Sequence, residues 1–181
     1  MKLEFTSDFA GREAEIARLC TDSFTVSDSV EEGRMVGQLV RDLMADTPRD
    51  DVIMWAAVED NKVTGCVFFS RLRFDGDDRT VFIMAPVAVK TESQNIGVGQ
   101  KMISRGLDDL RQRGVDFALC YGDPNYYIKT GFEPISADMA QPPLTLSMPF
   151  GWLGQPLSTK SNWPLVGPSH CVPALHKPAL W

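Results

Sequence analysis

The stretch VAVKTESQNIGVGQKMI, residues Val87 to Ile103, joins a strand pattern to a helix pattern through a corner that contains two glycines. It opens with the β-branched residues typical of a strand, and the apolar spacing becomes helical at Gly97 and Gly99. Backbone amides in the first turn of a helix lack intrahelical partners and attract anions. Glycines there would let a phosphate approach the main chain. The corner therefore predicts a pyrophosphate site, and the alternative is that both glycines only permit a tight turn.

Two familiar glycine motifs do not fit this corner. The dinucleotide fingerprint would place a third glycine at position 102, which is Met102, and it follows a parallel βαβ opening that is not predicted here. The P-loop requires Gly-Lys-Ser/Thr, which is absent from this stretch. The pattern that remains is Gln94-x-x-Gly97-x-Gly99 after a β-branched strand.

Apolar periodicity before the corner predicts two helices followed by three strands. The strand patterns are separated by short turns, so we expect an antiparallel meander. The predicted helices cover residues 11–24 and 30–44, the strands cover 52–60, 63–74 and 80–89, and the turns lie at 61–62 and 75–78.

After the corner, the pattern predicts a helix that ends at Gly114 and a nearly all-apolar strand over 115–122. A strand, helix, strand unit implies that this second strand runs parallel to the one that ends at Val89. Pro124 suits the first turn of a short helix that stops at Gly131. Pro86 predicts a bulge or split in the strand pairing, unless irregular pairing simply tolerates it.

The length of 181 residues and the ordinary globular composition predict one domain over 1–181, with a core over about 10–134. From Pro134 onward the chain holds nine of the 12 prolines and three of the four tryptophans, which excludes long helices there. We expect residues 135–181 to form a Pro/Trp-rich segment with one or two strands. Alternation over Leu144 to Met148 predicts one of them.

The net charge of −6 and pI near 4.9 argue against nucleic-acid or anionic-membrane partners. The chain has neither a signal-peptide pattern nor an apolar run of roughly 18 residues, so we expect a cytoplasmic protein without a membrane partner. The four cysteines are scattered without a CxxC pair, which favours reduced, mostly buried thiols over disulfides or a metal site. They are Cys20, Cys66, Cys120 and Cys171.

The Gln94-x-x-Gly97-x-Gly99 pattern matches the acyl-CoA signature of the GNAT N-acetyltransferase superfamily, and the chain resembles this family from about Ala10 to Pro134. The order of the predicted elements agrees, and Tyr127 stands four residues before Gly131-Phe132, as a tyrosine commonly does in that family. The resemblance implies an α/β fold with a mixed, mostly antiparallel central sheet, flanking helices and a V-shaped split between two parallel central strands.

The same resemblance implies that acetyl-CoA is the cosubstrate, without a metal. Main-chain groups of Val87 and Val89 would bond the pantetheine arm. The loop and the start of its helix would hold the pyrophosphate through Gln94, Asn95, Ile96, Gly97, Val98, Gly99 and Gln100.

Acetyl transfer to an amine requires a neutral nucleophile, a stabilised oxyanion and a proton for the departing thiolate. Tyr127 is the candidate proton donor, and the alternative is a partly buried aromatic with a satisfied hydroxyl. Because Phe82 to Ala85 contains no carboxylate, we expect a water-mediated base; Asp123 could serve, although it also suits the N-cap of the Pro124 helix.

Other reactive side chains have simpler interpretations. Cys120 lacks a nearby basic partner in the sequence, so burial is favoured over an acyl-cysteine role. His170 and His176 lack the further ligands that would complete a metal site, and we expect them at the surface or in tail packing.

The favoured hypothesis is an N-acetyltransferase whose acceptor, a small-molecule or peptide amine, attacks acetyl-CoA directly in a ternary complex. One alternative is a non-catalytic acyl-CoA-binding sensor or regulatory module. Another is a partner-binding protein that uses its tryptophan-rich tail. The sequence also leaves a homodimer open.

Overall fold

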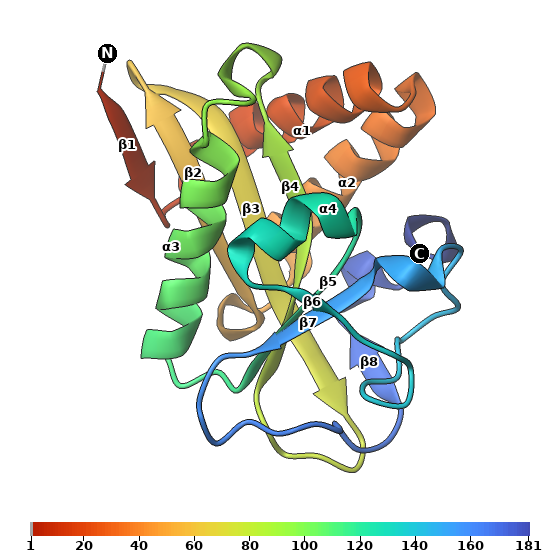
Figure 1. Ribbon diagram of the computed structural model, residues 1–181. Helices are drawn as coiled ribbons and strands as arrows, with labels where there is room; N and C mark the ends of the chain where they lie inside the picture. The colour runs from red at the N-terminus through yellow and green to blue at the C-terminus, as the bar shows by residue number, and fades with distance from the viewer. Residues whose placement is uncertain (1) are drawn as a thin grey trace. The chain divides into compact units, whose positions relative to one another are not determined.

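A computed structural model describes residues 2–181, which divide into two compact units. The first contains the chain up to Phe69 together with Pro86–Gly106, and the second contains Ser70–Ala85 and Leu107–Trp181. The prediction of a single domain stays a prediction. The main elements, labelled in Figure 1, are β1 (Leu3–Thr6), α1 (Glu13–Ser27), α2 (Val30–Asp46), β2 (Val52–Glu59), β3 (Lys62–Phe74), β4 (Val81–Val89), α3 (Val98–Gln112), β5 (Phe117–Tyr121), α4 (Pro124–Tyr127), β6 (Glu133–Pro134), β7 (Trp152–Pro156) and β8 (Ser169–Cys171).

The strands form one mixed sheet in the order β1-β2-β3-β4-β5-β7-β6, with β8 on β3. Strands β4 and β5 are parallel, whereas β1–β2, β3–β8, β5–β7 and β6–β7 are antiparallel. The predicted α/β fold with a mostly antiparallel sheet is therefore confirmed. Among the described helices, none is long and apolar enough to cross a membrane.

In the first unit, α1 and α2 lie side by side (Figure 1) because two glycines of α2 remove the side chains between them. A Cβ added to Gly33 would lie 2.0 Å from Thr25 Oγ1, and one added to Gly37 would lie 2.0 Å from Thr21 Oγ1. Ser29 starts α2 as its N-cap by accepting a hydrogen bond from the Glu32 amide. Both predicted helices are confirmed, and each ends two or three residues later than expected.

The β2–β3 hairpin turns at Asp60 and Asn61, whose φ angles are +48° and +62°. Two central residues with positive φ are typical of the two-residue turn that matches strand twist. The turn thus lies one residue earlier than predicted, and Lys62 already belongs to β3. The edge strand β1, which pairs with β2 from Leu3 opposite Glu59, was not predicted.

In the second unit, the parallel ladder of β4 and β5 runs from Val81 opposite Phe117 to Met84 opposite Cys120. It ends two residues before Pro86, while β4 itself continues to Val89. An interruption near Pro86 agrees with the inability of proline to donate a ladder hydrogen bond. The predicted parallel strand is confirmed, and a V-shaped slot at this point stays a prediction.

The predicted strand over Leu144 to Met148 is wrong: these residues form no strand. Pro142 and Pro143, directly before them, have no amide hydrogen to donate to a neighbouring strand. The amides of Ser147 and Met148 donate to groups other than the backbone of a neighbouring strand. Ser147 N donates to Trp181 O, and Met148 N donates to the Tyr121 hydroxyl. The strands within residues 135–181 are the short β7 and β8, with β6 directly before them, and no long helix forms there.

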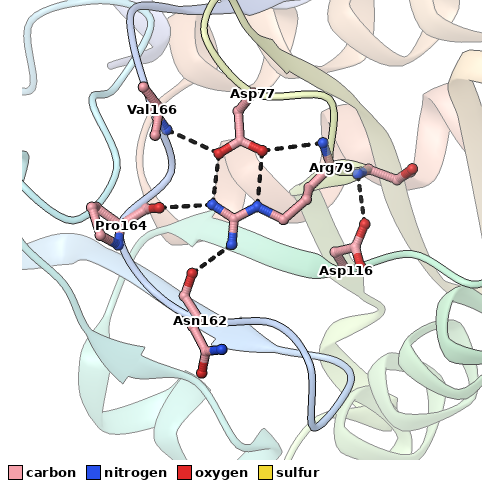
Figure 2. A network of polar contacts seen from close by, with 7 residues as sticks. Asp77, Arg79, Asp116, Asn162, Pro164 and Val166 are labelled. Atoms are coloured by element: carbon pink, nitrogen blue, oxygen red, sulfur yellow. Dashed lines mark hydrogen bonds and ion pairs between the residues drawn. The ribbon is translucent and has the colours of Figure 1, made fainter.

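The β3–β4 turn is clamped to the C-terminal segment by Arg79 (Figure 2). Its guanidinium group donates to both carboxylate oxygens of Asp77, at 2.8 and 2.6 Å, and to the carbonyl oxygens of Asn162 and Pro164. The Val166 amide donates to the same Asp77 carboxylate. This partly buried ion pair therefore holds residues 162–166, which have little regular structure of their own, to the β3–β4 turn.

Candidate functional site

The loop between β4 and α3 holds two residues in the left-handed conformation. The φ angles of Asn95 and Gly97 are +61° and +82°. A side chain at Gly97 would meet no atom within 4 Å, so the backbone angle, not packing, requires glycine there. Left-handed residues within a turn direct successive amides toward a common side, which is a known anion-binding arrangement.

The first turn of α3 supplies further amides. Lys101 N donates to Gly97 O at 3.1 Å, which is the first intrahelical bond, so the amides of Val98, Gly99 and Gln100 precede the helical ladder. Met102 and Ile103, on the apolar side of α3, are fully buried and fix the first turns of the helix in the first unit. The loop and this turn, residues 94–100, are called the cradle below. The cradle can bind an anion without any cationic side chain.

The end of β4 presents one partly open side next to the cradle. Val87 and Val89 are partly exposed, while Ala88 between them and Pro86 before them are buried. The carbonyl oxygen of Val89 accepts hydrogen bonds from Gln94 Nε2 at 2.9 Å and from Ser23 Oγ of α1 at 3.3 Å. Since a carbonyl oxygen has two lone pairs, this acceptor is occupied within the protein. Gln94 thus ties the loop to the strand, and its predicted ligand contact stays a prediction.

Tyr127 lies in the second unit, at the end of α4. Pro124 is in the first turn, and Asp123 caps the helix by accepting a hydrogen bond from Asn125 N at 2.9 Å. Asp123 therefore takes the N-cap role that was one of its two predicted roles. The helix is short and is followed by a 3-10 turn, Ile128–Thr130, which ends in a left-handed Gly131 with φ +92°.

The environment of Tyr127 keeps its phenol neutral. The ring packs edge-on against Tyr126 and Phe132, with centroids 5.1 and 6.3 Å away. Burial is the largest cause that raises its pKa above the ordinary value near 10, and the Cys120, Tyr126 and Asp123 groups add to it. The hydroxyl forms no hydrogen bond with the residues that the structure describes, so it is available as a donor.

The other reactive side chains are not arranged for chemistry. Burial raises the pKa of the Cys120 thiol, which therefore stays protonated and is a poor nucleophile. His170 is exposed and pairs with Asp75 at 2.9 Å, and His176 is also exposed. Within residues 2–181, no group of three His, Cys, Asp or Glu side chains could hold a metal ion.

Sequence reasoning missed the contacts that join distant parts of each unit. The Cys20 and Cys66 sulfurs lie 3.3 Å apart, and this hydrogen bond, together with burial, raises the pKa of the Cys66 thiol. Ser23 reaches Val89 over 66 positions, and Gln155 of β7 contacts the turn after Tyr127. No local motif marks these residues, because each contact depends on the fold.

The chain resembles known acetyltransferases over most of its length. The profile of the acetyltransferase (GNAT) domain matches residues 10–135. The uncharacterized N-acetyltransferase YjhQ of Escherichia coli K12 is 32% identical over 163 residues, which is 84% of this chain and 90% of that protein.

Two crystal structures share the fold at low sequence identity. The E. coli acetyltransferase YhbS in complex with CoA has a TM-score of 0.81 at 22% identity, covering 98% of this chain and 93% of the other. A Brucella melitensis GNAT acetyltransferase in complex with acetyl-CoA has a TM-score of 0.76 at 21% identity, covering 96% and 97%.

Proposed function

The chain belongs to the GNAT acetyltransferase family, and from this premise we propose that it transfers the acetyl group of acetyl-CoA to an amine. The acceptor is a small-molecule or peptide amine that attacks the thioester directly, in a ternary complex. The observation that carries the proposal is the cradle, where left-handed Asn95 and Gly97 precede an open first helical turn. A neutral, backbone-lined cradle suits the pyrophosphate of CoA.

The residues proposed to hold acetyl-CoA are those of the cradle and the end of β4. Amides of Gly97, Val98, Gly99 and Gln100 would contact the pyrophosphate, because the last three lie in the first turn of α3 and Gly97 directly precedes it. The partly open side at Val87 and Val89 would contact the pantetheine arm. YhbS and the Brucella protein were crystallised with CoA and acetyl-CoA, which supports the same ligand class here.

Tyr127 is the proposed proton donor. The departing thiolate has an ordinary thiol pKa of about 8.5, so it needs one proton and a hydrogen bond as it forms. The raised pKa of Tyr127 keeps the phenol protonated at neutral pH, and its hydroxyl is not used by described residues. The C–S bond breaks as the tetrahedral intermediate collapses, the phenolic proton moves to sulfur, and the phenolate regains a proton from solvent before the next turnover.

The attacking amine must lose its own proton by another route. Phe82, Ile83 and Met84 of β4 are buried and apolar, so this segment offers no base. Asp123 already uses one carboxylate oxygen as the helix cap. We therefore propose that water molecules carry this proton to solvent. We also propose that the enzyme is cytoplasmic.

A non-catalytic acyl-CoA sensor is the second candidate function. The absence of a carboxylate on β4 favours it, because this strand then supplies no base for the attacking amine.

The test is calorimetric titration with acetyl-CoA, using NAD as the control ligand, followed by thiol release with a panel of amines. The panel contains an alkylamine, a polyamine, an aminoglycoside and a dipeptide. We expect saturable binding of acetyl-CoA alone and thiol release with at least one amine. Binding without turnover would indicate the sensor, and no binding would refute both candidates.

A further inference from the structure

We propose that Gln155 is a positioning residue that holds the Tyr127 turn through its side-chain amide. The proposal rests on the proposed function, in which the Tyr127 phenol protonates the thiolate. Gln155 lies on β7, and its residue is only 6% exposed although the side chain is polar. A buried amide is costly unless both of its ends are hydrogen-bonded.

Both ends of the Gln155 amide have partners. Nε2 donates to Thr130 O at 3.2 Å, and Oε1 accepts from a guanidinium nitrogen of Arg111 at 3.3 Å. Arg111 can only donate, so it fixes which end of the amide faces α3. The Nε2 group must then face the turn that follows Tyr127.

The turn carries this restraint back to Tyr127. Thr130 Oγ1 donates to Tyr127 O at 2.8 Å. The residue whose carbonyl oxygen is bonded to Gln155 is therefore also hydrogen-bonded to the Tyr127 backbone. Gly131, next in the chain, leaves room for the amide: a Cβ there would lie 3.1 Å from Gln155 Oε1. The path Arg111–Gln155–Thr130–Tyr127 therefore consists entirely of direct hydrogen bonds.

Bare backbone supports the Tyr127 ring itself. A Cβ added to Gly122 would lie 2.7 Å from Tyr127 Cε2, so the ring rests directly on the Gly122 main chain. The hydrogen bond from Thr130 restrains the Tyr127 backbone, and the contact with Gly122 restrains the Tyr127 ring. Loss of the Gln155 link would release the turn while leaving the ring support in place.

The first test compares Gln155→Met, which keeps the side-chain length without hydrogen bonds, with Gln141→Met, which changes an exposed glutamine of the same unit. Turnover is measured with acetyl-CoA and the panel amine that gives the fastest thiol release. We expect Gln155→Met to lower kcat on the order of tenfold to a hundredfold, since small misplacements of a catalytic group cost this much. The Kd for acetyl-CoA and the Gln141→Met kinetics should stay unchanged.

The same substitution is then made in a Tyr127→Phe protein. If Gln155 acts through the phenol, Gln155→Met should cause no further loss of kcat in the Tyr127→Phe protein. If Gln155 has a general structural role, Gln155→Met should lower kcat in that protein as well. A full additional loss, or unchanged kcat in the single variant, would overturn the positioning role. Full turnover by Tyr127→Phe alone would instead remove the proposed acid, and the positioning role with it.

A second pair of variants keeps the test decisive if Gln155→Met does not fold. Thr130→Val removes the hydroxyl that grips Tyr127 O, and Thr130→Ser retains it. We expect Thr130→Val to lower kcat and Thr130→Ser to restore it, with the Kd for acetyl-CoA unchanged in both. Equal kcat in the two variants would contradict the proposed path.

Discussion

Arg79 and Asp77 form a bidentate salt bridge, in which two guanidinium nitrogens donate to the two carboxylate oxygens (Figure 2). The Asp77 side chain is only 6% exposed, and the Arg79 side chain is 27% exposed. The hydrogen bonds from Arg79 are the largest cause that lowers the pKa of Asp77 to about 2. Since the same arginine holds two carbonyl groups of the C-terminal segment, charge at Asp77 stabilises that segment.

Acid should therefore weaken the protein through Asp77. The folded-state pKa is lowered, so the stabilisation is complete above the unfolded value near 3.8 and is lost as pH falls toward 2. We expect Asp77→Asn to reduce the free energy of unfolding by about 1 to 2 kcal/mol at pH 7, allowing for solvent screening of the partly exposed arginine.

Urea unfolding at pH 7 and near pH 2 measures this difference. The gap between wild type and Asp77→Asn should shrink at the lower pH, whereas Asp78→Asn, at the exposed neighbouring position, should behave like wild type at both. A gap that is the same at both pH values would show that the Asp77 charge is not the stabilising element.

Gly97→Ala should weaken acetyl-CoA binding by distorting the cradle. An alanine in the left-handed region costs about 1 to 2 kcal/mol, and here no neighbouring atom would clash. Gly11→Ala is the matched control, because Gly11 also has positive φ, at +77°, and open space around it. We expect similar losses of stability in both variants and a loss of acetyl-CoA affinity, about tenfold, only in Gly97→Ala.

Calorimetric titration of both variants with acetyl-CoA provides the measurement. Equal affinity in Gly97→Ala and Gly11→Ala would mean that the glycine corner only turns the chain, which was the alternative interpretation of the sequence.

Much of the first unit could be predicted because its signals are local. The periodicity of α1 and α2 and the apolar runs of β2 and β3 extend over many residues, and the two glycines of the cradle lie within a single turn. The N-cap of α4 was predictable for the same reason, since Asp123 accepts from the Asn125 amide two residues along the chain and Pro124 occupies the first turn.

The C-terminal segment was harder to predict because its structure depends on distant partners. Alternation over residues 144–148 indicated a strand, but Ser147 and Met148 bond to Trp181 and Tyr121. The Gln155 contacts likewise cross 25 positions to Thr130 and 44 to Arg111. Such pairings carry no period or motif, so only the folded chain reveals them.

Tyr127→Phe should lower turnover far more than it weakens acetyl-CoA binding. Loss of a positioned general acid costs roughly a hundredfold to ten-thousandfold, while the phenyl ring keeps its packing against Phe132. Because burial raises the Tyr127 pKa, loss of activity through its deprotonation should occur only above pH 10. Tyr126→Phe is the control, and we expect it to retain most of its activity.

Steady-state kinetics with the best panel amine, together with acetyl-CoA titrations, separates the two effects. If Tyr126→Phe lost as much kcat as Tyr127→Phe, the acid assignment would have to be abandoned.

Cys120→Ala should leave the reaction pathway intact. Its thiol is buried and its pKa is raised by burial, so it stays protonated, whereas an acyl-cysteine pathway would require a thiolate. We expect turnover within a fewfold of wild type and no acetylated enzyme by mass spectrometry after mixing with acetyl-CoA alone. An acetyl group on wild-type Cys120, lost in the variant together with turnover, would replace direct attack by a covalent mechanism.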